Sequence, residues 1–362
     1  MKRLVSSLLA AVLLVGVAGS GTLFAQENNP RVIRIGSAYG GGYGKPYSTG
    51  TIGIVHARGL LEKEFEKDGI KIDWYFFKGA GPATNEAIAN NTLDFAYEGD
   101  FPSIVGKAGG LKTRIIAAGS VRTDVFILVP NDSQIKSIKD LKGRKVGIFK
   151  GINSNLTFSR LLEANGLVEK DLRLYNFGTA EIEAALASKD IEAGVGGLRT
   201  RDLGLTKVLF STTPAIKAID PQKVPDDWKT AGQLLVIDDF AKKYPDIVKR
   251  VVKVYVEAAK WGSEDKNRSE LFKLWSQNGT PYSLLKEQYG GKSGKHITTP
   301  LLDEFFVNHY RNGVAYSKEN KYIRKPFDVD QWIDRSYLDA ALKELKLEKY
   351  WPQYDAQGKK KK

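Results

Sequence analysis

The sequence contains no cysteine, one methionine and only three histidines among its 362 residues. Without cysteine there can be no disulfide bond, no thiolate nucleophile, no cysteine metal ligand and no cysteine for attaching a lipid anchor. The histidines, His56, His296 and His309, stand far apart and include no pair four residues apart, so their spacing does not indicate a metal site. We therefore expect neither a bound metal nor a cofactor.

Two common catalytic motifs are also missing. No GxSxG sequence occurs, which excludes the nucleophile elbow of α/β-hydrolases. Glycine is followed by lysine at positions 44–45 and 291–292, but Tyr39 and Lys286 occupy the places where a phosphate-binding loop needs its first glycine. The sequence therefore favours a protein that binds a molecule over one that transforms it.

Long apolar runs are rare as well. The run Leu4–Val17 is shorter than the roughly 18 to 20 residues that a transmembrane helix needs. It follows Lys2 and Arg3 and is followed by small residues up to Ala25, which is the organisation of a secretory signal. We expect residues 1–25 to be removed and the mature protein to be exported and soluble; a membrane-anchored protein is the alternative.

Size and charge agree with an exported binding protein. Removing the signal leaves 337 of the 362 residues, which suits two lobes of ordinary size. The formal charge of +13 falls to +11 without the signal and to +7 without the four terminal lysines as well. No basic run other than that tail occurs, so we expect no nucleic-acid partner. The remaining excess of positive charge would attract small anions or keep the protein soluble.

Strand and helix patterns alternate through most of the chain. This alternation is typical of a mostly parallel sheet covered by helices on both faces. After residue 237 the patterns are helical. The main segments are strands from Arg31 and at 70–77, 93–97, 113–120 and 125–129, and helices at 52–67, 103–108, 244–261, 269–275, 282–289, 301–312 and 330–345.

One helix-and-strand unit occurs twice. A shift of 98 positions lays residues 87–94 over 185–192, although a chance match of so short a pattern is the alternative. Ligands of open α/β sheets bind at the carboxyl ends of strands. We therefore expect the two strand ends to face each other across a cleft. The first copy ends at Glu98 and Asp100 and the second at Gly197 and Arg199.

Four segments carry a family resemblance, in this order after the signal: HARGLLEKEF, AGPATNEAIANNTLDFAYEGDFPSIVGKAGG, ILVPNDSQIKSIKDLKGRKVGIFKGINSN and KPFDVDQWIDRSYLDAAL. From Arg31 to Leu347 the chain resembles the substrate-binding proteins of ABC importers for aliphatic sulfonates, nitrate and taurine. The resemblance implies a type II periplasmic binding fold, in which two Rossmann-like α/β lobes joined by a hinge close on a small anionic solute. It further implies a periplasmic monomer that delivers this solute to an inner-membrane permease.

This resemblance sets the expected organisation. Lobe one is predicted to comprise residues 31–123 and 231–350, and lobe two residues 124–230; segment 351–362 is expected to end in disordered lysines. A sulfonate or taurine-like solute is expected, and nitrate, a pyrimidine precursor or an aromatic acid is the alternative. An enzyme on the same fold is the alternative of another class, but a desulfinase that resembles this family uses a nucleophilic cysteine, which this chain lacks.

Three features depart from the family pattern. The loop 39–50 is long and rich in glycine and tyrosine. Just after the strand of lobe two, residues 196–202 read GGLRTRD where the family often has a tryptophan and a proline. Glu98 stands where many relatives have a small or neutral residue. Glu98 would favour a cationic group on the ligand or pair with Arg199 or Arg122. The loop would form an aromatic wall, or else it is a surface loop.

Oxyanions are well held by backbone N–H groups at helix N-termini and by hydroxyl and guanidinium donors. Helix caps are the alternative role for Asn153 and Ser154, and Asp100 would cap a helix that begins at Pro102. A surface salt bridge or hinge contact is the alternative for each arginine. The predicted ligand-binding residues are Ser37, Tyr39, Tyr43, Gly81, Glu98, Asp100, Ser120, Arg122, Asn153, Ser154, Gly197 and Arg199.

Overall fold

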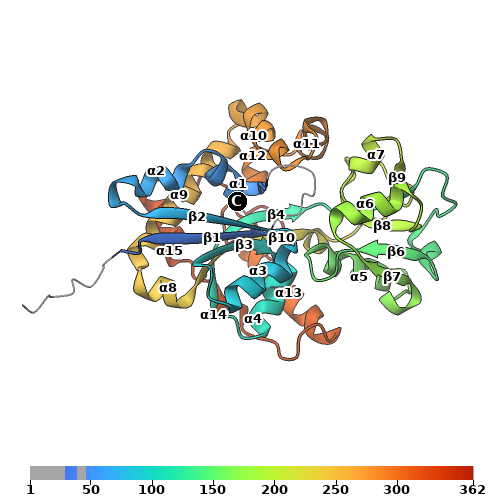
Figure 1. Ribbon diagram of the computed structural model, residues 1–362, viewed down its shortest axis with the longest axis horizontal. Coiled ribbons are helices and arrows are strands. Elements are labelled where there is room, and N and C mark those ends of the chain that lie inside the picture. Colours follow the sequence, from blue (N-terminus) through green and yellow to red (C-terminus); the bar gives the residue numbers. More distant parts are fainter. Residues whose placement is uncertain (1–28, 39–45, 362) are drawn as a thin grey trace, which may run out of the picture.

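The computed structural model describes residues 29–38 and 46–361, and in these the chain builds two α/β lobes, each around its own sheet (Figure 1). The predicted signal and the predicted site residues Tyr39 and Tyr43 lie outside the described residues. Two separate sheets confirm the expected fold class. Within the described part of the chain, we find no helix that is both long and apolar enough to cross a membrane.

The sheet of lobe one mixes parallel and antiparallel strands. Its first three strands run parallel, but β10 is antiparallel to both of its neighbours, with Glu98 opposite Gln233. The predicted mostly parallel arrangement holds for four of the five strands, but it did not include the reversed direction of β10, because alternation in a sequence does not show strand direction. In spatial order the strands are β2 (Lys71–Phe77), β1 (Val32–Ala38), β3 (Phe95–Gly99), β10 (Thr230–Ile237) and β4 (Thr113–Thr123).

Lobe two repeats this plan on a smaller scale. Its strand β5 lies antiparallel to both neighbours, and the others run parallel. The strands in spatial order are β7 (Arg173–Asn176), β6 (Lys145–Ile148), β8 (Ala193–Gly196), β5 (Phe126–Pro130) and β9 (Thr206–Ser211). Its helices are α5 (Ser154–Ala164), α6 (Thr179–Ala187) and α7 (Arg199–Asp202).

The helices before lobe two cover the sheet of lobe one. The predicted helix 52–67 is interrupted at Gly59, whose φ of 58° is a left-handed conformation that glycine adopts without strain. The helix predicted to start at Pro102 begins at Asp100 instead. These helices are α1 (Gly50–Ala57), α2 (Leu60–Phe65), α3 (Ala80–Ala89) and α4 (Asp100–Ala108).

The segment after β10 is helical, as predicted, and it completes the core of lobe one. The long helix α9 places Val248, Val252 and Val256 in that core. The expected single helix over 330–345 is two helices, since Ile333 pairs with Ile115 beside the sheet. The helices are α8 (Asp238–Lys243), α9 (Pro245–Ser263), α10 (Arg268–Trp275), α11 (Tyr282–Tyr289), α12 (Gly294–Ile297), α13 (Glu304–Glu319), α14 (Val329–Trp332) and α15 (Ser336–Glu344).

The chain passes between the lobes twice, from β4 to β5 and from β9 back to β10 (Figure 1). Ion pairs join the two crossings: Arg122 Nε lies 3.3 Å from Asp226 Oδ2, and Lys229 Nζ lies 3.9 Å from Asp124 Oδ1. The division into residues 31–123 with 231–350 and residues 124–230 remains our proposal for the extents of the lobes.

The C-terminal segment was expected to end in disorder, but the structure folds residues 353–361 into a tight hairpin against α13. Tyr354 and Lys360 form an antiparallel bridge, and the Lys361 N–H donates to the Gln353 carbonyl over 2.8 Å. Lys361 Nζ also lies 2.5 Å from Glu304 Oε1, at the start of α13. The prediction rested on the lysines being a charge run with no apolar partner, and it missed the acidic partner because Glu304 is remote in sequence.

Candidate functional site

Two adjoining cavities lie where the lobes meet. One has a volume of about 220 Å³ and is lined mainly by lobe one, and the second, of about 360 Å³, extends to lobe two. Thr49, Thr123, Phe149, Asn153 and Thr179 line both cavities, among others. Together these volumes fall within the range for small-molecule sites. The arrangement suits a small solute enclosed between two lobes.

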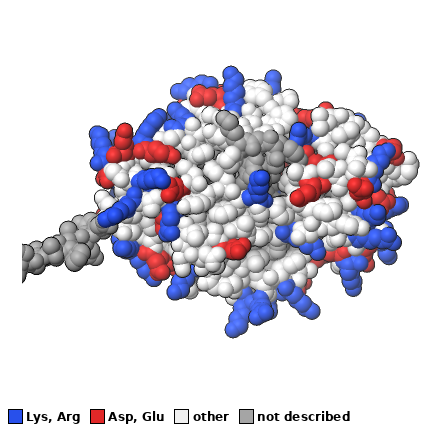
Figure 2. All heavy atoms as spheres, in the orientation of Figure 1, with Lys and Arg blue, Asp and Glu red and all other residues white. Residues whose placement is uncertain are grey.

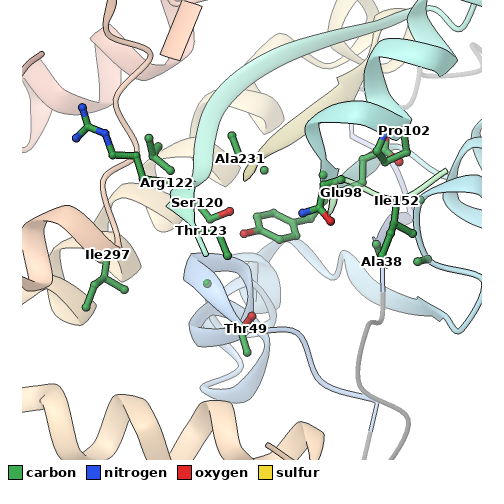
Figure 3. A pocket seen from close by; sticks show the side chains of 18 of the residues that line it. Ala38, Thr49, Glu98, Pro102, Ser120, Arg122, Thr123, Ile152, Ala231 and Ile297 are labelled. Carbon is green, nitrogen blue, oxygen red and sulfur yellow. The ribbon is translucent and has the colours of Figure 1, made fainter. Parts of the chain in front are cut away.

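The lobe-one wall is built at the ends of β3 and β4 and at the start of α3 (Figure 3). Gly81, Glu98, Ser120 and Arg122, all predicted from the sequence, line the first cavity. A Cβ atom at Gly81 would lie 2.3 Å from the side chain of Pro102, so only glycine fits there. This close packing brings the N-terminal end of α3 to the cavity wall, where its free N–H groups favour an anion.

The lobe-two wall contains the starts of α5 and α6. Asn153 and Ser154 line the second cavity, and the Asn153 side chain accepts from the Ser154 N–H over 3.0 Å at the start of α5. Gly197 and Arg199 line it as well, at the end of β8. Asn153 therefore has the helix-cap role that was the alternative in the sequence. Asn153 also lines both cavities.

The lobes touch directly beside the cavities. A Cβ atom at Gly99 of lobe one would lie 2.8 Å from the Cβ of Asn153 in lobe two, and one at Gly151 would lie 3.0 Å from Pro82. These contacts depend on glycine and bring the N-terminal regions of α3 and α5 to opposite sides of the same space. A solute bound there is reached from both lobes.

Two predicted residues lie away from both cavities. Ser37 is fully buried and its hydroxyl is hydrogen-bonded to that of Ser48. Asp100 is 2% exposed; its Oδ1 accepts from Phe101 N over 2.7 Å, and its Oδ2 accepts from Ala231 N over 2.8 Å and lies 2.7 Å from His309 Nε2. Because partners within the protein occupy both oxygens, Asp100 ties β10 and α13 to α4 and lines neither cavity, contrary to the prediction.

Arg122 lines the first cavity, and its guanidinium points away from Glu98 (Figure 3). The guanidinium carbon lies 4.0 Å from the ring centre of Phe305 and 4.4 Å from that of Tyr354, and Nη2 donates to the Gly358 carbonyl over 3.2 Å. Its backbone is left-handed, with φ of 56°. These contacts fit the hinge role that was the alternative for this residue.

Glu98 differs from the acids around it. Its Oε1 accepts from the Ser103 hydroxyl over 2.7 Å, whereas its buried Oε2 has no hydrogen-bond partner among the described residues. Burial raises the pKa of Glu98 to about 8, and the hydrogen bond from Ser103 offsets part of this rise. The ion pairs of the described chain do not include one between Glu98 and Arg122.

Sequence reasoning missed the wall that the C-terminal helices supply. Trp275, Tyr289, Lys292 and His296 all line the first cavity. Burial, and then the charges of Arg122 and Lys292, lower the pKa of His296 to about 4. These residues lie roughly 200 positions from the first strands, and no local motif marks them. The described residues contain no group of three side chains placed to hold a metal ion.

Comparison with known proteins places this geometry in a family. The model of the family described as NMT1/THI5 like matches residues 62–268, more than half of the chain. The chain belongs to the NMT1/THI5-like family. A Bacillus subtilis member of the curated proteins, provisionally named aliphatic sulfonates-binding protein, is 26% identical over 350 residues, covering 95% of this chain and 98% of its own.

Solved structures show the same two-lobed fold for this NMT1/THI5-like chain. A structure from Methylobacillus flagellatus, titled a sulfonate ABC transporter periplasmic binding protein, is 31% identical with a TM-score of 0.74, over 90% of this chain and 97% of that one. The alkanesulfonate-binding protein of Xanthomonas axonopodis bound to MOPS is 20% identical with a TM-score of 0.67, over 85% and 99%. A desulfurization enzyme shares the fold at 14% identity and a TM-score of 0.63, over 86% and 99%, so the fold is found in binding proteins and in an enzyme.

Proposed function

We propose that this chain is the periplasmic substrate-binding protein of an ABC importer, that it closes on a small sulfonate or taurine-like anion, and that it delivers this solute to an inner-membrane permease. The observation that carries the proposal is the pair of adjoining cavities between the lobes, with the starts of α3, α5 and α6 at their walls. Helix N-termini stabilise an oxyanion through N–H donors and the helix dipole.

The relatives support the class of solute. The names of the Bacillus and Methylobacillus proteins both refer to sulfonates, and their similarity extends over nearly the whole chain. We further propose that the protein acts as a monomer. We also propose that it binds without catalysis, since the chain has no cysteine to act as nucleophile. Its surface agrees with a small-anion partner: Figure 2 shows Lys and Arg scattered among Asp and Glu, without a continuous basic band on this face.

Thermal unfolding with and without ligand tests the proposal. The chain without residues 1–25 is melted in a buffer that contains no sulfonate, with ethanesulfonate, taurine, MOPS, nitrate, benzoate or a pyrimidine added. A ligand present at 100 times its Kd stabilises the native state by about 2.7 kcal/mol, so a bound sulfonate must raise the melting temperature. A shift with nitrate, benzoate or the pyrimidine but with none of the sulfonates would change the solute, and no shift with any of the six would refute a small-anion receptor.

A further inference from the structure

Helix α11 is held by both lobes at once. It lies on the side of lobe one that faces α7 of lobe two (Figure 1). Tyr282, Leu285 and Tyr289 share one face of this eight-residue helix, because they stand at positions i, i+3 and i+7. Leu284 and Glu287, three residues apart, share the opposite face. The two faces have different partners, and these partners belong to different lobes.

The first face packs on lobe one through aromatic rings. The ring centre of Tyr289 lies 5.5 Å from that of Trp275 on α10. The ring centre of Tyr282 lies 6.1 Å from that of Phe272 on the same helix. Between them, Leu285 is 2% exposed and belongs to the core of lobe one. Edge-to-face rings at these separations attract each other in addition to burying apolar area, so this face is firmly anchored.

The opposite face reaches lobe two through one apolar side chain and one ion pair. Leu284 is 3% exposed and belongs to an apolar cluster whose other members in the described chain, Phe126 among them, come from lobe two. Arg201 on α7 donates from Nη1 to Glu287 Oε1 over 3.0 Å and from Nη2 to Glu287 Oε2, so this pair is bidentate. The same Nη2 lies 2.6 Å from Oδ1 of Asp202, within lobe two.

The same helix also forms part of the cavity walls. Leu284 and Gln288 line the second cavity, and Tyr289 lines both cavities. A solute in these cavities is therefore bordered by the helix that joins the lobes. Arg201 and Glu287 are not among the described residues that line either cavity. Any effect of this ion pair on ligand affinity must then come through the position of the lobes.

Lobes that open to admit a solute must release α11 on one side. The face toward lobe two is the weaker one, because it has no aromatic pair among the described contacts and its ion pair is partly exposed, with Glu287 at 42%. We propose that α11 is a latch: it stays on lobe one, and Leu284 and Glu287 engage lobe two when the lobes close on the solute. This inference rests on the proposed function and makes Arg201 and Glu287 positioning residues.

Two neighbouring leucines give a matched comparison, measured by melting the chain without residues 1–25. Leu285→Ala removes packing from the core of lobe one and should lower the melting temperature by roughly 4 to 10 °C, with or without ethanesulfonate. Leu284→Ala should melt within about 2 °C of the wild type without ligand, because this side chain has already left lobe two. It should nevertheless weaken ethanesulfonate binding about tenfold or more, since the closed form loses its packing.

The ion pair has a control of its own. Glu287→Gln removes the bond between the lobes, whereas Asp202→Asn removes the bond of the same arginine within lobe two. Calorimetric titration with ethanesulfonate should give a Kd about 1.5- to 5-fold higher for Glu287→Gln and an unchanged Kd for Asp202→Asn. In an Arg201→Gln background, Glu287→Gln should have no further effect, because the two side chains act as a pair.

Spin labels measure the movement directly, and a chain without cysteine can be labelled at chosen sites. Three exposed lysines are replaced by cysteine in pairs: Lys286 on α11, Lys273 on α10 and Lys170 in lobe two. Pulsed electron paramagnetic resonance then gives the 286–170 and 286–273 distances. Addition of ethanesulfonate should shorten the distance between 286 and 170 and leave that between 286 and 273 unchanged.

Several results would overturn the latch. If ethanesulfonate changes the 286–273 distance and not the 286–170 distance, α11 moves with lobe two. If neither distance changes, α11 is not released at all. A ligand-free Leu284→Ala that melts as low as Leu285→Ala would show that Leu284 never leaves lobe two, and equal Kd values for Glu287→Gln and Asp202→Asn would remove the ion pair from the latch. If the wild type binds no sulfonate, the proposed function fails, whereas the ligand-free melting of the two leucine variants still tests the latch.

Discussion

Replacing Arg122 with alanine should destabilise the protein by about 3 kcal/mol. The side chain is 6% exposed and joins three segments: the crossing from lobe one, the first turn of α13 through Phe305, and the C-terminal hairpin. Each desolvated contact of the guanidinium with an aromatic ring contributes about 0.5 to 2 kcal/mol, and its hydrogen bond to the Gly358 carbonyl about 1.5 to 3 kcal/mol. The pair with Asp226 adds little because that carboxylate is half exposed.

The backbone at this position allows a sharper comparison. Arg122 is left-handed, with φ of 56°, and alanine would keep the steric cost of that conformation whereas glycine would relieve it. Arg122→Gly should therefore be about 0.5 to 1 kcal/mol more stable than Arg122→Ala, although both lose the same side-chain contacts. Truncation after residue 352 removes the hairpin and should reproduce part of the loss.

Urea unfolding followed by circular dichroism measures these differences. Arg311→Ala is the matched control, because Arg311 lies on α13 but is 53% exposed in its ion pair with Asp330, and its loss should cost less than about 1 kcal/mol. If Arg122→Ala unfolds within 0.5 kcal/mol of the wild type, or if truncation and Arg122→Ala are fully additive, the hairpin does not hold Arg122.

Three further substitutions probe the cavity walls. Gly81→Ala would place its Cβ 2.3 Å from Pro102, so we expect a lower melting temperature and weaker ethanesulfonate binding; unchanged values for both would refute the tight packing at the start of α3. Burial raises the pKa of Glu98 to about 8, so the contribution of Glu98 to the free energy of unfolding is complete below about pH 4.5 and is lost as the pH rises to about 8. Ligand-free Glu98→Gln should therefore melt above the wild type at pH 8 but not at pH 4.5. The pKa of His296 is lowered to about 4, so the wild type should lose up to about 3 kcal/mol between pH 6.5 and 4, and His296→Gln should lose less; equal acid sensitivity would contradict the burial of His296.

The strands and the helical C-terminal region could be predicted because their patterns are local. Alternating Ile33 and Ile35 in β1, and Val248 and Val252 in α9, show burial within a few residues. The family resemblance supplied the arrangement in two lobes. Strand direction could not be predicted, because the chain enters β10 after returning from lobe two, and no local sequence pattern shows from which end a strand enters its sheet.

The lobe walls of the candidate site were partly predictable for the same reason. Gly81, Asn153 and Gly197 follow strands, Glu98 and Ser120 lie near the carboxyl ends of β3 and β4, and these strand ends meet at the cavities. Asp100 looked equivalent to Glu98 in sequence, but its partners Ala231 and His309 are more than 130 residues away. The roles of such neighbouring acids depend on long-range contacts, and these appear only once the chain has folded.

The position of β10 has a consequence for how the protein folds. This strand lies between β3 and β4 and is the only hydrogen-bonded link between them in the described sheet, yet it follows all of lobe two in the chain. Lobe two is therefore complete in sequence before the sheet of lobe one can close. Long-range pairing of this kind slows folding. An exported chain would thus hold lobe one open until residue 237 is available, and translocation itself would set the order in which the two halves form.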